Sequence, residues 1–326
     1  MIEEVAENIY RIEVRMPGNP LKALNSYFIR GDEQDLLIDT GFKLPECRED
    51  LKEGLKKLNS HQQRRNILLT HLHSDHSGLA DEFVGDDCHI YMNQVDLSYQ
   101  EDLCNGDFYS GMVEQYIQAG YPENLARQHK EKNPAARGSM KKVDARFVGL
   151  QEGGRLTVGK YTLELIATPG HTPGNSMFWI EDKKIMFTGD NILFDITPNI
   201  VSLYEVTDSL GSYLKSLDKS KKYSVDYAFP GHRKPGDYKK RIDEIKGHHL
   251  RRIEESLKIV NEYPGSDAYA ITAQMKWKIH AKNWDDFPDA QKWFAFGECL
   301  AHLDYLRLRG KVIRKNRDDK WVYYPA

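Results

Sequence analysis

The sequence predicts a layered α/β protein with two β-sheets inside, followed by a helical unit that ends in a β-hairpin. In residues 1–246, short apolar or β-branched runs bounded by Gly, Pro and Asp alternate with helical stretches. Residues 247–326 carry helical patterns and then a hairpin pattern. The composition agrees with a folded protein, because 40% of the 326 residues are hydrophobic and the formal net charge is −3. These values exclude an intrinsically disordered chain and a globally basic nucleic-acid binder.

The first group of strands consists of short runs that end at turn residues. We expect these strands over residues 8–14, 24–30, 35–39, 66–70 and 88–92. Between them, Pro45 opens a helix that continues to Leu58 and places Leu51 and Leu55 on one face. The run at 66–70 is apolar enough for a buried strand and leads directly into His71.

A polar, helix-like segment interrupts the strands over about residues 94–142. Met112 and Tyr116 lie at helical spacing within it, and Gly120 and Pro122 mark the change to a second helix. We interpret the segment as an insertion that covers another part of the protein. The later expected elements are strands over residues 155–158, 161–167, 176–180, 184–188 and 225–229 and a helix near 208–217.

The chain after the last strand is expected to form a unit of its own, and its helices followed by a terminal hairpin resemble a winged-helix module. The expected elements are a connecting helix over residues 248–262, helices over 268–280 and 288–309, and hairpin strands over 311–315 and 320–324. We therefore predict two domains. The larger domain covers residues 1–246, with the helical insertion at about 94–142, and residues 247–326 hold the connecting helix and the winged-helix-like module.

Several classes of protein are excluded by features of the chain. The four cysteines lie apart without a Cys-x-x-Cys pair, which argues against a disulfide framework and against a cysteine zinc site. The N-terminal residues are acidic and lack the apolar core of a signal peptide. No apolar stretch approaches the ~18 residues of a membrane-spanning helix. We therefore expect a cytoplasmic protein without a membrane partner.

The strongest chemical signal is the segment Thr70-His71-Leu72-His73-Ser74-Asp75-His76, in which three imidazoles and a carboxylate follow a buried strand. His71 and His73 point to the same side if the backbone is extended, and the turn that follows can bring Asp75 and His76 to a neighbouring position. A polar loop with hydrogen-bonded histidines is the simpler interpretation of one such residue. Three histidines and an aspartate at these offsets favour a site for Zn²⁺ or a similar divalent ion.

Three later motifs also place a metal-binding side chain at the end of a predicted strand. His171 lies in a turn stiffened by two prolines and two glycines, Asp190 follows Phe187-Thr188-Gly189, and His232 follows Phe229-Pro230-Gly231. Each motif alone is more typical of a turn with a solvated polar residue. Together with the first segment they supply five histidines and two aspartates, which are too many for one zinc ion and suit two.

The order of these motifs resembles that of the metallo-β-lactamase superfamily, over roughly residues 5–240. The resemblance implies a four-layer αββα sandwich with the metals at one edge and a catalytic role for the larger domain. It implies as ligands His71, His73 and His171 for the first metal, Asp75, His76 and His232 for the second, and Asp190 between the two. Asp39 is expected to be a structural carboxylate near the site.

Two positions narrow the class within the superfamily. A β-lactamase of the commonest type would carry Cys in place of Asp190 and a residue other than His at position 76. This chain has both His76 and Asp190, so its metal site resembles those of glyoxalase II and RNase Z.

The resemblance implies a metal-dependent hydrolase with two divalent ions. Such a pair can hold a bridging water as hydroxide at neutral pH and polarise the scissile bond. Asp75 is predicted to be catalytic as well as a ligand, because its carboxylate can orient the hydroxide and shuttle its proton. Zinc is the expected metal, and histidine and carboxylate ligands also suit iron and manganese.

Two classes of substrate stay open. The favoured class is a small-molecule ester, thioester or lactone, bound under an aromatic wall that the insertion would supply from Tyr99, Phe108, Tyr109 and Tyr116. The alternative is endonucleolytic cleavage of single-stranded RNA, since the C-terminal unit resembles the tail of a subgroup that includes a mitochondrial β-lactamase-like endoribonuclease.

The C-terminal tail carries the residues on which the RNA alternative depends. Trp321, Tyr323 and Tyr324 could stack bases. The neighbouring cations are Arg307, Arg309, Lys311, Arg314, Lys315, Arg317 and Lys320. We favour a solvated basic hairpin that only packs, because charge runs are usually solvated faces. The insertion and the tail are also the candidate surfaces for a homodimer.

Overall fold

The first sheet of the protein is built in chain order from the N-terminus. In the computed structural model its strands run β1-β2-β3-β4-β5-β6-β7. Pairing is antiparallel from β1 to β4 and parallel from β4 to β7. The strands are β1 (Ile2–Ala6), β2 (Ile9–Arg15), β3 (Ala23–Ile29), β4 (Asp35–Ile38), β5 (Arg65–Leu68), β6 (Ile90–Asn93) and β7 (Phe147–Leu150).

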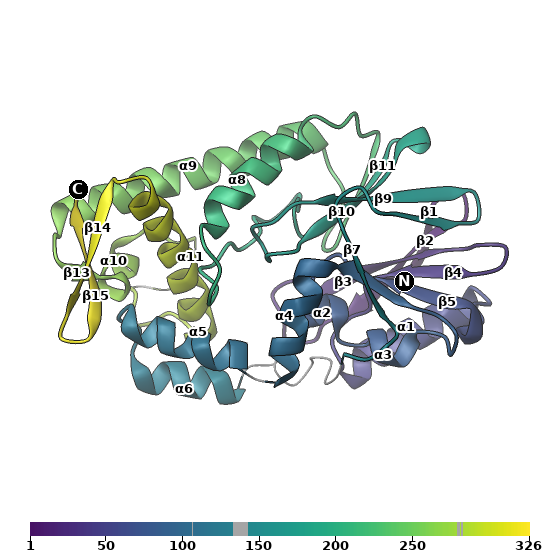
Figure 1. The fold of residues 1–326 in the computed structure, drawn as a ribbon, viewed down its shortest axis with the longest axis horizontal. Coiled ribbons are helices and arrows are strands. Elements are labelled where there is room, and N and C mark those ends of the chain that lie inside the picture. The colour runs from purple at the N-terminus through teal and green to yellow at the C-terminus, as the bar shows by residue number, and fades with distance from the viewer. Residues whose placement is uncertain (106, 133–142, 279–280, 282) are drawn as a thin grey trace. The chain divides into compact units, whose positions relative to one another are not determined.

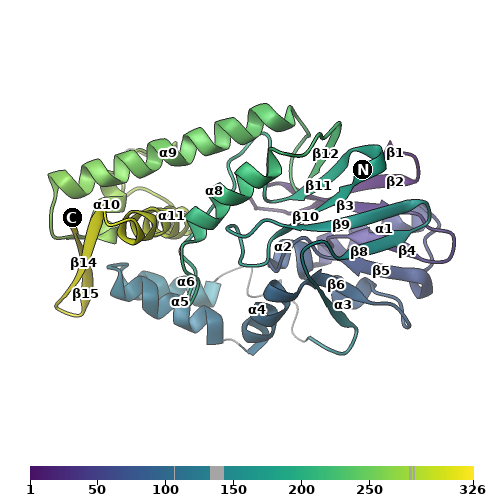
Figure 2. The ribbon, with the colours of Figure 1, turned by 45° about the horizontal axis from the view of Figure 1, so that its top comes forward.

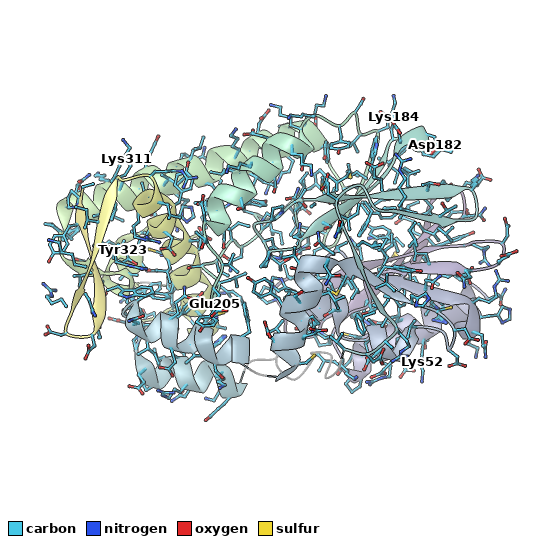
Figure 3. All side chains as sticks on the ribbon, viewed as in Figure 1. Lys52, Asp182, Lys184, Glu205, Lys311 and Tyr323 are labelled. Carbon is cyan, nitrogen blue, oxygen red and sulfur yellow. The ribbon has the colours of Figure 1, made fainter. Side chains whose placement is uncertain are left out.

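The second sheet follows in the order β12-β11-β10-β9-β8. Its strands are β8 (Arg155–Val158), β9 (Tyr161–Ala167), β10 (Ser176–Ile180), β11 (Ile185–Gly189) and β12 (Tyr227–Pro230). All pairs are antiparallel except β11 with β12, which are parallel. Figure 2 shows these strands in the turned view, and Figure 3 labels Asp182 and Lys184 at the turn between β10 and β11.

The two sheets face each other across one apolar core. Tyr27 of β3 contacts Phe187 of β11 and Phe229 at ring-centroid distances of 5.3 and 5.4 Å. A second core lies between the other face of the first sheet and its helices, where Leu51 and Leu55 of α1 (Pro45–Lys57) are buried. The exposed side of α1 carries Lys52, which Figure 3 labels at the outer surface.

Helical turns also cover the outer face of the second sheet. Ser220, at the end of α8 (Ser209–Ser220), lies 3.9 Å from the Met177 sulfur, and Trp179 contacts Tyr223 with ring centroids 5.5 Å apart. The order helix, sheet, sheet, helix confirms the predicted α/β sandwich (Figure 1). The shorter helices of this part are α2 (Ser74–Ser77), α3 (Ala80–Phe83) and α4 (Gln94–Asn105), and single 3-10 turns span Gln62–Arg64 and Glu181–Lys183.

The chain forms two compact units, and the structure describes residues 1–105, 107–132, 143–278, 281 and 283–326. The first unit holds the two sheets and consists of Met1–Asn105, Pro134–Pro198 and Ser216–Ile242. The second consists of Gly106–Asn133, Asn199–Lys215 and Asp243–Ala326. The predicted domains, residues 1–246 and 247–326, stay a prediction.

The second unit packs helices against a sheet of the order β13-β15-β14. Tyr116 is fully buried in it and contacts Trp293 and Phe296, at centroid distances of 4.4 and 4.9 Å. Figure 3 labels Tyr323 in its last strand. Its elements are α5 (Asp107–Gln118), α6 (Glu123–Lys132), most of α9 (Tyr238–Glu262), β13 (Ser266–Asp267), α10 (Ala268–Gln274), α11 (Asp289–Leu308), β14 (Val312–Arg317) and β15 (Lys320–Pro325).

The predicted elements differ from the observed ones in a few places. The helix expected from His248 begins at Tyr238, ten residues earlier. The strands β1, β7 and β13 were not predicted, because each is short or only partly buried. The helix expected over 268–280 ends at Gln274, and residues 279 and 280 lie outside the described part. The C-terminal hairpin is present, while its assignment to a winged-helix domain stays a prediction.

Among the described residues, no helix combines the length and the apolar character that crossing a lipid bilayer needs.

Candidate metal centre

The loop after β5 brings the first four candidate ligands together. β5 is buried along its whole length, and the chain leaves it through the segment that contains His71 and His73. His71 Nε2 lies 3.1 Å from His73 Nδ1. The short helix α2 begins directly afterwards and carries Asp75 and His76, and the His76 ring lies 4.1 Å from the His71 ring between centroids.

The other three candidates stand where strands of the second sheet end. His171 lies in the loop after β9, Asp190 directly after β11, and His232 shortly after β12. β11 and β12 are parallel neighbours with Gly189 opposite Pro230, so Asp190 and His232 emerge at the same edge. A side chain on Gly231 would meet the Asp190 carboxylate at 2.7 Å, so glycine permits this close approach.

Six of the seven side chains form two adjacent groups, Asp190 forms a third with His71 and His76, and within each group the donor atoms lie within 4.8 Å of one another. One group is His71, His73 and His171, and the other is Asp75, His76 and His232. Asp190 lies between them, with Oδ1 3.5 Å from His76 Nε2 and Oδ2 3.6 Å from both His171 Nε2 and His232 Nε2. The structure therefore brings together all seven sequence-predicted residues, and their binding of metal stays a prediction.

The spacing of the donors fits a tetrahedral ion. Two ligands at about 2.0–2.1 Å from one zinc ion lie about 3.3 Å apart. In the second group, His76 Nε2 lies 3.2 Å from His232 Nε2, His232 Nε2 lies 3.3 Å from Asp75 Oδ2, and the distance from His76 Nε2 to that oxygen is longer, at 3.9 Å. Imidazole nitrogens and carboxylate oxygens at this spacing are the ligands that Zn²⁺ and similar ions take. The residues present therefore fit a divalent metal.

The outer nitrogens of three histidines are held by hydrogen bonds. His76 Nδ1 lies 2.7 Å from Asp39 Oδ2, and His232 Nδ1 lies 2.8 Å from the Ala23 carbonyl oxygen. The Thr70 hydroxyl donates to Asp39 and lies 3.0 Å from His71 Nδ1. A proton on each outer nitrogen leaves the Nε2 lone pair available to an ion. Asp39 is thus the expected structural carboxylate.

Charge at the site is distributed as a cation would require. Burial alone would lower the pKa of His76, but the carboxylates of Asp39 and Asp190 raise it well above its usual value. Burial and the neighbouring imidazoles lower the pKa of His71 well below its usual value, so that ring stays neutral. Burial would raise the pKa of Asp75, yet His76 and other partners bring it to about 2. The ionised carboxylates thus supply negative charge that a divalent ion would balance.

A protein-family model shows to which superfamily the chain belongs. The model of the metallo-beta-lactamase superfamily matches residues 22–232. The chain belongs to this superfamily. The match confirms the predicted family, the predicted fold class and the predicted enzyme class, a metal-dependent hydrolase, while the kind and number of the ions stay predictions.

Relatives within the superfamily resemble most of the chain. It is 26% identical over 279 residues to a beta-lactamase-like protein 2 homolog of Caenorhabditis elegans, covering 84% of this chain and 78% of that protein. It is 25% identical to the human acyl-coenzyme A thioesterase MBLAC2, covering 71% and 80%. A metallo-beta-lactamase family protein of Thermus thermophilus superposes with a TM-score of 0.82 at 25% identity, covering 99% and 100%.

One residue that contacts the ligand loops was not singled out from the sequence. Asp96, in the first turn of α4, is completely buried and accepts hydrogen bonds from both loops of the first group. An acidic residue in a first helical turn is common because it favours the helix dipole, so the sequence alone offers no signal for this second role.

Proposed function

We propose that the chain is a dinuclear metal-dependent hydrolase that acts on a small ester, thioester or lactone. The proposal rests on the two adjacent donor groups with the Asp190 carboxylate between them. Two divalent ions, zinc by expectation, would supply an ionised water as nucleophile and a Lewis acid for the scissile carbonyl.

The side chains of the site would hold the ions, orient the attacking water and accept its proton. Asp75 is 14% exposed, whereas His76 and His232 beside it are fully buried. Its carboxylate is therefore the acidic group of the second donor set that is open to an incoming water or substrate. We assign to Asp75 the orientation of the nucleophile and the acceptance of its proton.

The name of one relative supports the thioester as the substrate class. Human MBLAC2 is named an acyl-coenzyme A thioesterase, and the match to it covers 71% of this chain. The expected aromatic wall needs revision, however, because Tyr116 is fully buried against Trp293 within the second unit. Tyr99, Phe108 and Tyr109 remain the members of the proposed wall.

The RNA alternative finds little support in the C-terminal hairpin. Tyr323 is fully buried, and the guanidinium of Arg314 already lies over the Trp321 ring at 3.7 Å from its centroid. Arg309 forms an ion pair with Asp208 at 3.1 Å. The buried Tyr323 cannot stack a base, and Arg314 already occupies one face of Trp321.

A parallel assay of acyl thioesters, lactones and single-stranded RNA tests the proposal. Hydrolysis of a thioester or a lactone that is lost in Asp75→Ala is the expected result. Metal analysis of the same preparation should give two ions per chain. RNA cleavage that depends on Asp75, or a purified protein that binds no divalent ion, would contradict the proposal.

A further inference from the structure

The two loops that carry the first donor group are tied to the same carboxylate, that of Asp96. Its Oδ2 accepts hydrogen bonds from the Leu72 backbone N–H at 2.9 Å and from the Thr172 hydroxyl at 2.7 Å. Its Oδ1 accepts one from the Gly174 backbone N–H at 2.5 Å. Leu72 lies between His71 and His73, and Thr172 directly follows His171. One side chain therefore fixes the backbone next to all three donors of the group.

Hydrogen bonds also join the start of α4, the helix that carries Asp96, to the loop that contains His171 and Gly174. Asn93, at the end of β6, donates to the Ser176 hydroxyl at 3.0 Å, and that hydroxyl donates to the Gly174 carbonyl. A side chain on Gly174 would lie 2.4 Å from the Asp96 backbone nitrogen, so the absence of one lets the loop reach the helix. The position of Asp96 relative to the His171 loop is thereby set by several contacts.

The chemistry of these contacts requires a carboxylate. Three donors converge on two oxygens, and Asp96 is completely buried, so no water replaces a lost acceptor. Asparagine has one oxygen and an amide that donates, so its amide nitrogen would face either Gly174 N–H or the donors of Leu72 and Thr172.

We propose that Asp96 is the positioning residue of the first donor group, setting the distance of His171 from His71 and His73. This inference rests on the proposed metal-dependent function. Asp39 has the corresponding task at the second group, since its carboxylate holds His76. Asp39 also reaches His71 through the Thr70 hydroxyl, whereas the described hydrogen bonds of the Asp96 carboxylate all go to the two loops of the first group.

Stepwise binding of Zn²⁺ to the metal-free full-length protein, measured by competition with a chelator, tests this role. Asp96→Asn should lower the affinity for one of the two Zn²⁺ ions by about 10–100-fold, as for other residues that orient metal ligands. The affinity for the other ion should change by less than about threefold. Asp35→Asn is the matched control, because Asp35 is buried and accepts from Gly31 N–H and the Ser60 hydroxyl, away from the histidines. Its Zn²⁺ affinities should equal those of the wild type.

Variants at Thr172 keep the test decisive if Asp96→Asn does not fold. Thr172→Val removes one of the three hydrogen-bond donors to Asp96 and should lower the affinity for the same ion. Thr172→Ser keeps the hydroxyl and should retain the wild-type affinity. Wild-type affinity for both ions in Asp96→Asn, or in Thr172→Val, would overturn the inference. A wild-type protein that binds no Zn²⁺ would instead refute the proposed function on which it rests.

Discussion

Single imidazoles at the site are oriented by what their outer nitrogen contacts. His76 is held by a carboxylate and His232 by a backbone carbonyl, and in both rings Nε2 then faces the site. His73 is different, because its Nδ1 is the nitrogen that faces His71. Which nitrogen each histidine presents depends on the fold around it as well as on its place in the motif.

Removal of His73 should abolish one of the two metal sites. His73→Ala leaves His71 and His171 without their third imidazole, and two protein ligands hold Zn²⁺ poorly. We expect about one zinc ion per chain instead of two, measured by elemental analysis after dialysis. His89→Ala is the control, because His89 is exposed and lies outside the ligand groups. Two ions retained in His73→Ala would contradict its assignment as a ligand.

Neutralising Asp39 should weaken the second site. Asp39→Asn removes the carboxylate that lies 2.7 Å from His76 Nδ1 and accepts from the Thr70 hydroxyl. Loss of such an orienting partner typically costs about 10–100-fold in metal affinity. Competition with a chelator measures this loss of Zn²⁺ affinity. Unchanged affinities for both ions would show that Asp39 has no orienting role.

At the scale of elements, the centre depends on loops that follow neighbouring strands. Parallel pairing of β11 with β12 delivers Asp190 and His232 to one edge, and Gly231, directly after β12, lies against Asp190. Asn25 of β3 secures this edge by donating to the carbonyls of Pro230 and Arg233. These hydrogen bonds hold the chain after β12 against β3.

A methyl group at Gly231 should disturb this edge. In Gly231→Ala the new carbon would lie 2.7 Å from Asp190 Oδ1 and 2.8 Å from His76 Cε1. Overpacking of this kind costs about 1–3 kcal/mol of unfolding free energy, and Zn²⁺ affinity should fall as well. Urea denaturation and chelator competition measure the two effects.

Gly247→Ala provides the control for this substitution. Gly247 lies within helix α9, and its new carbon would meet only the end of the Arg251 side chain at 3.3 Å. We expect it to raise the unfolding free energy by about 0.5–1 kcal/mol, because alanine is the better helix former. Equal effects of the two variants would argue against crowding at the metal edge.

At the scale of the whole molecule, a second buried cluster of ionisable groups lies outside the metal centre. His249 of α9 and His302 of α11 are fully buried, with Nδ1 and Nε2 3.4 Å apart. Glu298 lies 3.2 Å from the Arg252 guanidinium. Burial lowers the pKa of His249 to about 3 and also lowers that of His302. Both rings are therefore neutral in the folded protein at pH 7.

The neutral pair should make the second unit sensitive to acid. The folded pKa of His249 lies below 6.5, the ordinary value, so the unfolded chain binds more protons between about pH 6.5 and 3. The unfolding free energy should therefore fall as pH falls through this window, by up to about 1.4 kcal/mol per pH unit for each ring. Burial would raise the pKa of Glu298, but the hydrogen bond with His248 and the Arg252 guanidinium help to lower it to about 2, so Glu298 acts in the same direction below pH 4.5.

Urea denaturation at several pH values checks this expectation. His249→Phe should reduce the loss of unfolding free energy between about pH 6.5 and 5, because the ring that must gain a proton is gone. His61→Phe is the control, since His61 is exposed. The same pH dependence in wild type and His249→Phe would contradict the prediction.

The sequence was sufficient to predict most strands and the side chains that come together at the site, because rare side chains and apolar runs are local signals. His71 and His232 could be recognised at strand ends without any knowledge of packing. Asp96 could not, since its role depends on backbone donors that approach only in the folded chain. The stripe that includes Tyr116 likewise predicted a helix but not its partner, because Trp293 lies far away in the sequence.

The interleaved composition of the two units has a consequence for synthesis. Helices α5 and α6 leave the ribosome long before Trp293 and Phe296 exist, although these rings cover Tyr116 in the finished protein. The face of α5 that carries Tyr116 must therefore stay without these partners while the strands of the second sheet are still being synthesised. Nascent chains in such a state are prone to aggregate, so the speed of translation through the last residues of the chain bears on the yield of folded protein.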